Sequence, residues 1–61
     1  MTIKVYYIEN TNTLEDTLDA LATIIPCFVD LEPIEMNYEK VTIMARVEDL
    51  PTVENYLAPL V

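Results

Sequence analysis

The chain has 61 residues and carries 11 Asp and Glu against three Lys and Arg, which gives a net charge of −8. With 52% hydrophobic residues it is too apolar for a disordered acidic tail, and its charge disfavours binding to nucleic-acid backbones or anionic membranes. It lacks His and Gly and has one cysteine, Cys27, so an internal disulfide is excluded, and no catalytic motif is present. We expect a single small domain that acts through protein contacts and is not an enzyme.

The first strand is predicted over residues 3–8, where β-branched and aromatic residues are frequent. Its alternating residues are Ile3, Val5 and Tyr7 on one face and Lys4, Tyr6 and Ile8 on the other. A helix is predicted from Leu14, with Thr13 as its N-cap and Asp16 three residues later in a variant of the capping box. Its apolar stripe ends before Pro26 and consists of Leu14, Leu18, Leu21 and Ile25.

The rest of the chain predicts two more strands and a second helix. Residues 27–31 alternate, with Cys27 on the inward face, and residues 34–39 form a long hairpin connection. Residues 40–47 predict the third strand, whose inward face is Val41, Ile43, Ala45 and Val47. The second helix opens with Asp49 and Pro51 and ends around Pro59, with an apolar stripe of Val53, Tyr56, Leu57 and Leu60.

This order of elements, β-α-β-β-α, predicts an α+β domain with a three-stranded, antiparallel-dominated sheet and two helices on one face. The topology resembles a ferredoxin-like unit that lacks its last strand. The resemblance covers the whole chain, rests on topology without any motif, and implies no function. In that arrangement the first strand is an unpaired edge guarded only by Lys4, so we expect a homodimer or strand addition to a partner there.

The predicted faces segregate charge. If the odd-numbered residues of the third strand face the helices, all three cations, Lys4, Lys40 and Arg46, lie on the open face of the sheet with Asp30 and Glu32. The helical side is then anionic without compensation, through Glu15, Asp16, Asp19, Glu48, Asp49 and Glu54.

Three acidic residues of the first helix are the first candidate site. Asp19 follows Glu15 by four residues and Asp16 by three, a like-charge spacing that costs a few tenths of a kcal/mol. One interpretation is a solvated acidic face that supports solubility, with Glu15 and Asp16 placed in the first turn by the helix dipole. The other is a surface that docks on a basic partner.

The open face is the second candidate site, because Tyr6, Phe28 and Met44 are predicted to form an apolar cluster there. Burial in a homodimer and contact with another protein are the two interpretations. RNA recognition by such aromatic residues needs a basic surface, which the net charge of −8 opposes.

Other residues carry weaker signals. The carboxylates of Asp30, Glu32, Glu35 and Glu39 lack the regular spacing and central Gly of a calcium loop, so we predict no metal site and no cofactor. Cys27 is interpreted as a core residue. The sequence shows neither a signal-peptide pattern nor an apolar stretch of membrane-spanning length, and we expect a cytoplasmic protein without membrane contact.

Three functional hypotheses follow. The first is an acidic inhibitor or nucleic-acid mimic that occludes a basic surface of a partner protein, a type of protein commonly encoded by phages and mobile elements. The second is a small dimeric ferredoxin-like regulatory domain that binds a metabolite or ion between its subunits. The third is a subunit of a larger assembly.

Overall fold

The computed structural model describes all 61 residues, Met1–Val61, and has the predicted order of elements. The strands are β1 (Thr2–Glu9), β2 (Cys27–Pro33) and β3 (Tyr38–Ala45), and the helices are α1 (Asn12–Ile24) and α2 (Leu50–Leu57). Short 3-10 turns lie at Glu35–Asn37, Val47–Asp49 and Ala58–Leu60. The prediction of a small α+β domain with a three-stranded antiparallel sheet and two helices is therefore confirmed.

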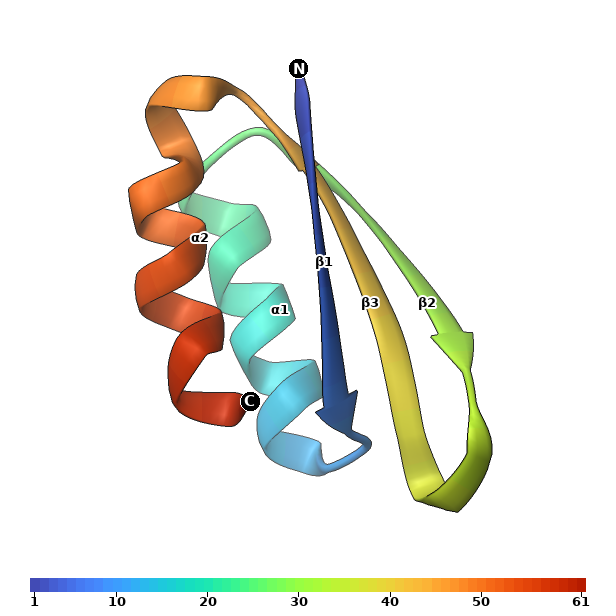
Figure 1. Cartoon of the computed structure of the whole chain (residues 1–61). Helices are drawn as coiled ribbons and strands as arrows, with labels where there is room; N and C mark the ends of the chain where they lie inside the picture. The colour runs from blue at the N-terminus through green and yellow to red at the C-terminus, as the bar shows by residue number, and fades with distance from the viewer.

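The sheet has the strand order β1-β3-β2, and β3 pairs antiparallel with both neighbours. The last strand in the chain is thus the central one, and β1 and β2 are the two edges. Figure 1 shows α1 and α2 lying side by side on the same side of the sheet, with no element on the other side. Neither helix combines the length and hydrophobicity that crossing a lipid bilayer requires.

The core lies between the sheet and the helices. The odd-numbered residues of β3 point inward as predicted, and the apolar stripes of α1 and α2 cover them. The buried hydrophobic residues are Tyr6, Ile8, Leu14, Leu18, Leu21, Val41, Ile43, Ala45, Val53 and Leu57. Only 11 of the 61 residues are buried, so the domain rests on a very small core and its stability is expected to be marginal.

Helix α1 begins earlier than the sequence predicts. Its N-cap is Thr11, whose side-chain oxygen accepts a 3.3 Å hydrogen bond from the Leu14 backbone N–H, and not Thr13. The chain leaves β1 at Glu9 and needs only Asn10 before the cap, so Thr13 already lies inside the helix. Glu15 is consequently the only acidic residue of the first turn, and Asp16 lies beyond it.

Strand β3 ends earlier than predicted, at Ala45. The Asp49 backbone N–H donates to the Arg46 carbonyl at 2.9 Å, which closes a 3-10 turn directly after the strand. Val47, predicted to face the core as part of the strand, lies in that turn and is 69% exposed.

The connection between β2 and β3 is a tight hairpin whose tip has two residues in the left-handed region, Met36 with φ 62° and Asn37 with φ 66°. Among non-glycine residues, Asn adopts this conformation comparatively readily, whereas it is unfavourable for Met. The tip is tied to the end of β1, because the Asn10 backbone N–H donates to the Asn37 carbonyl at 2.8 Å.

Candidate functional site

Each side chain of β1 lies on the opposite side of the sheet from the one predicted. Tyr6 and Ile8 point towards the helices, and Tyr6 is only 8% exposed because it lies beside inward-facing Val41. The placement of Tyr6 on the open face with Phe28 and Met44 is therefore wrong. Both sides of β1 are apolar, so alternation alone does not select a side, and the register against β3 decides it.

Tyr6 and Lys4 instead join β1 to the second helix. The Tyr6 hydroxyl donates a 3.1 Å hydrogen bond to Glu54 Oε2, and Lys4 Nζ lies 3.6 Å from the same oxygen. Burial, together with the bonded Glu54 carboxylate, raises the pKa of Tyr6 to about 12. Lys4 thus lies on the helical side of the sheet, contrary to the prediction.

Arg46 also leaves the open face, because β3 ends one residue before it. Its Nε lies 2.8 Å from Asp49 Oδ2 and 3.8 Å from Glu48 Oε1. Together, Lys4 and Arg46 pair with all three acidic residues predicted around the second helix. The expectation of a helical side without any compensating cation is therefore wrong for this half of the surface.

Uncompensated charge is concentrated on α1. Glu15, Asp16 and Asp19 are exposed and form no ion pair, and α1 contains no Lys or Arg. These are the three acidic residues that the sequence singled out. Their like-charge spacings remain unrelieved in the folded protein.

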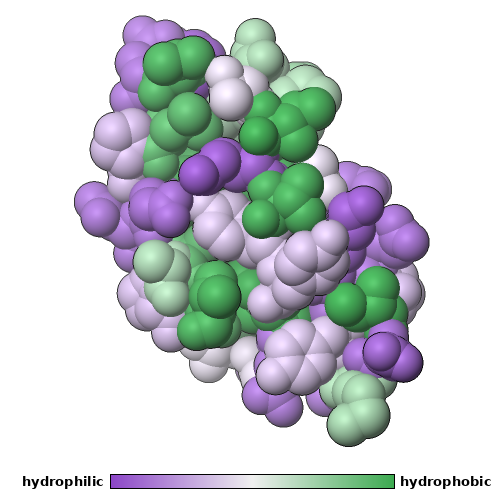
Figure 2. Space-filling view, viewed as in Figure 1, coloured by the Kyte–Doolittle hydropathy of each residue, from purple (hydrophilic) through white to green (hydrophobic).

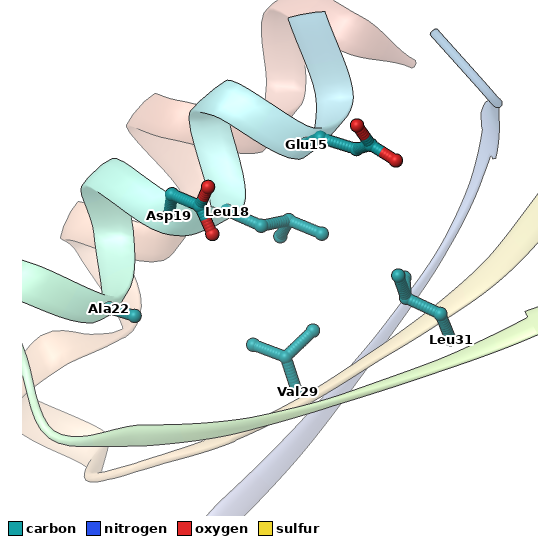
Figure 3. A pocket seen from close by; sticks show the side chains of 6 residues that line it. All are labelled: Glu15, Leu18, Asp19, Ala22, Val29 and Leu31. Carbon is teal, nitrogen blue, oxygen red and sulfur yellow. The ribbon is translucent and has the colours of Figure 1, made fainter. Parts of the chain in front are cut away.

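A groove runs between α1 and β2, and two of these acidic residues lie on its rim. It has a volume of about 440 Å³ and is lined by Glu15, Leu18, Asp19, Ala22, Val29 and Leu31. Figure 3 shows Leu18 of the helix and Val29 and Leu31 of the strand pointing into the space between the two elements. We call this feature the acidic groove; it has an apolar floor and a carboxylate rim, and Asp16 lies outside it.

The acidic groove exists because α1 covers β2 incompletely. Leu31 points to the helical side of the sheet, yet it is 42% exposed, and Val29 is only half-buried. Burial is more complete over β1 and β3, where the inward-facing side chains of Ile8, Val41 and Ile43 are almost fully buried. The groove therefore follows from the small size of the helical layer.

The open face is the second candidate surface, defined as the side of the sheet away from the helices. Phe28 and Met44 both lie on this face, as the sequence predicts. They are direct neighbours across β2 and β3, and Ile3 completes the row on β1. Ile3, Val5 and Tyr7 are also exposed here, although the predicted faces of the first strand imply that they point towards the helices. The open face comprises Ile3, Val5, Tyr7, Glu9, Phe28, Asp30, Glu32, Tyr38, Lys40, Thr42 and Met44.

Hydrophobic side chains are frequent on the surface as well as in the core. Figure 2 shows hydrophobic residues reaching the surface among hydrophilic ones. Alternation correctly places Phe28 and Met44 on the open face, whereas in β1 it does not indicate which side faces the helices. No sequence signal indicated the acidic groove, because it depends on how far α1 reaches over β2.

Cys27 lies against the core as predicted and is half-buried. Burial raises the pKa of its thiol, and the negative charge of Asp49 raises it further. No three Cys, Asp or Glu side chains gather in a set that could hold a metal ion. Comparisons with protein-family models, curated proteins and solved structures found no match.

Proposed function

We propose that this chain is a small acidic protein-interaction module that inhibits a partner protein by occluding a basic, nucleic-acid-binding surface. In this role Glu15, Asp16 and Asp19 take the place of backbone phosphates. The proposal is carried by the acidic groove, where two carboxylates without a cationic partner stand over an apolar floor.

The acidic groove suits a long cationic side chain of the partner. Lys and Arg have an apolar stem and a charged end, so the stem can cover Leu18 and Val29 while the end meets the Glu15 and Asp19 carboxylates. Glu15 and Asp19 are one helical turn apart on the same side of α1, a spacing at which one guanidinium can contact both. Asp16 lies outside the groove and adds to long-range attraction.

The distribution of the three cations supports the same surface. Lys4 and Arg46 pair with acidic residues near α2, which leaves α1 as the part of the helical layer with unpaired negative charge. A basic partner is therefore steered to α1 in preference to α2. Steering of this kind acts mainly on the association rate and weakens with salt.

A second function stands as an alternative, namely a dimeric ferredoxin-like regulatory domain that binds a metabolite or ion. The strand order β1-β3-β2, with β1 at an edge, is what a ferredoxin-like sheet without its last strand would have. The exposed open face favours its dimer. This alternative predicts a ligand-dependent rise in melting temperature. The third hypothesis, a subunit of a larger assembly, predicts instead that the chain copurifies with its partners in fixed stoichiometry.

The test is a pull-down from host lysate, eluted in steps of increasing salt, followed by affinity measurements on the partner. The variant Glu15→Gln/Asp16→Asn/Asp19→Asn removes the three negative charges of α1. We expect it to raise Kd at least ~10-fold and to flatten the salt dependence of binding. The matched control, Glu9→Gln/Glu35→Gln/Glu48→Gln, changes net charge equally outside α1 and is expected to leave most of the affinity. Equal loss in both variants, or no loss in either, contradicts the proposal.

A further inference from the structure

The open face has the composition of a protein interface. Six large apolar or aromatic side chains on it are between 36% and 68% exposed, namely Ile3, Val5, Tyr7, Phe28, Tyr38 and Met44. They come from all three strands and share one side of one sheet, so they form a continuous surface and not scattered single residues. Aromatic residues and Met are enriched in interface centres.

We propose that the occupant of this face is a second copy of the chain, packed sheet against sheet. At roughly 200 Å² for a large side chain, the exposed fractions of the six residues amount to about 600 Å² on each copy. Two copies then bury ~1,200 Å² of apolar surface, which reaches the ~1,200 Å² lower limit of specific protein complexes. Aligned packing of two sheets at about 30° is a common arrangement of this kind.

The face also carries charges of both signs, with Lys40 among Glu9, Asp30 and Glu32. Lys40, in the central strand, is the one Lys or Arg that forms no ion pair in the single chain. Glu32 is its neighbour across β2, and Asp30 lies on the same face. A two-fold axis along β3 puts Lys40 opposite its own counterpart and one strand away from Glu32 of the second copy. Each Lys40 side chain then reaches diagonally to that Glu32, which gives two equivalent ion pairs.

The row Ile3, Met44 and Phe28 is self-complementary in the same way. With the two-fold axis along β3, Met44 meets its own counterpart and Ile3 meets Phe28 of the second copy. Apolar side chains therefore meet at this end of the sheet, whereas further along it Val5 lies opposite Asp30 and Tyr7 opposite Glu32 of the second copy. The small core of the single chain is a further reason to expect a dimer, because domains of this size commonly need stabilisation from oligomerisation or another added source.

The dimer leaves both acidic grooves free, because they lie on the helical side of the sheet. The proposal is thus independent of the proposed function, and either can fail alone. If both hold, the active species presents two grooves on opposite outer surfaces, and binding to a partner with two basic sites is strengthened by avidity.

Analytical ultracentrifugation and small-angle scattering of the wild-type protein test the dimer. We expect a mass of twice 7.0 kDa at concentrations of ~100 µM. The radius of gyration should rise from the 10.8 Å of the single chain to about 14 Å, the value for a compact particle of twice the length. A protein that remains monomeric up to ~1 mM overturns the proposal. This holds even if a different protein is later found to bind this face.

Variants locate the interface. Ile3→Lys/Phe28→Lys is expected to raise the dimer Kd at least ~10-fold, whereas the control Ile24→Lys/Val47→Lys removes exposed apolar residues elsewhere, changes charge equally and leaves Kd unchanged. A dimer that survives the first pair uses another surface, such as the β1 edge, and overturns the proposal. If circular dichroism shows that the first pair does not fold, a charge reversal tests the same interface. Lys40→Glu is then expected to weaken the dimer, and Glu32→Lys/Lys40→Glu is expected to restore it. Absence of either effect overturns the proposal.

Discussion

The hydroxyl of Tyr6, in the first strand, donates a 3.1 Å hydrogen bond to Glu54, seven residues from the C-terminus. It is the only side-chain hydrogen bond that joins β1 to α2. The buried aromatic ring contributes to the core, while its hydroxyl reaches a carboxylate at the edge of the helical layer. This link makes stability depend on the protonation of Tyr6.

Tyr6→Phe is expected to lower the free energy of unfolding by about 1–2 kcal/mol at pH 7, measured by urea denaturation. Folding raises the pKa of Tyr6 from 10.0 to about 12, so its stabilising contribution is complete below pH 10 and is lost as the pH rises towards 12. The wild type should therefore lose more stability than Tyr6→Phe over that interval. Tyr7→Phe is the matched control, because Tyr7 is exposed on the open face. If the free energy of unfolding depends on pH identically in the wild type and in Tyr6→Phe, the stability is not linked to the protonation of Tyr6.

Asp19→Lys is expected to stabilise the fold while weakening partner binding. The change replaces repulsion with Glu15 by an attractive pair four residues apart with Glu on the N-terminal side. The increase in the free energy of unfolding should be about 0.5–1 kcal/mol at low ionic strength and should shrink in ~0.5 M NaCl. Thermal denaturation at two salt concentrations measures it. A destabilised variant at low salt would show that Asp19 has a structural role in the free protein.

The thiol of Cys27 should react slowly in the folded protein. Burial and the charge of Asp49 raise its pKa, so little thiolate is present at pH 8. We expect alkylation by iodoacetamide to be at least ~10-fold slower in the native state than in urea. Equal rates in both conditions would show that β2 opens readily at this end.

Met36→Asn is expected to raise the free energy of unfolding by about 0.5–1 kcal/mol. Met36 has φ 62° and is 83% exposed, so the substitution relieves an unfavourable backbone conformation without removing core contacts. The midpoint of thermal unfolding reports the change, and it should rise by ~2–8 °C. Met36→Gln is the control for loss of the exposed apolar side chain, because Gln lacks the preference of Asn for this conformation, and a similar rise in both variants would contradict the assignment to backbone strain.

The element order and the core of this domain could be predicted from the sequence because their patterns are unambiguous. Leu14, Leu18 and Leu21 form a single apolar stripe on α1. In β3, apolar and polar residues alternate from Lys40 to Ile43. In β1 both faces are apolar, and the sense of Tyr6 depends on its pairing with Val41, a residue far away in the chain. Local pattern cannot determine such a choice.

The acidic residues of the candidate site were identifiable for a different reason. The like-charge spacing of Glu15 and Asp19 is visible in the sequence, as is the absence of any Lys or Arg in the helix. The sequence does not indicate which other acidic residues have a cationic partner, because pairs such as Lys4 with Glu54 join residues far apart in the chain. The acidic groove likewise requires knowing that Leu31 extends beyond the cover of α1.

The central position of β3 determines how the chain can fold. Both β1 and β2 hydrogen-bond only to β3, and Thr2 pairs with Ala45. During synthesis, the first strand and first helix are complete long before β3 exists, so the earliest residues wait without a strand to pair with. No N-terminal fragment that stops short of β3 contains a single strand pair. The domain therefore assembles as one late, cooperative event, and a single backbone cut in the hairpin at residues 34–37 would leave no independently folded half.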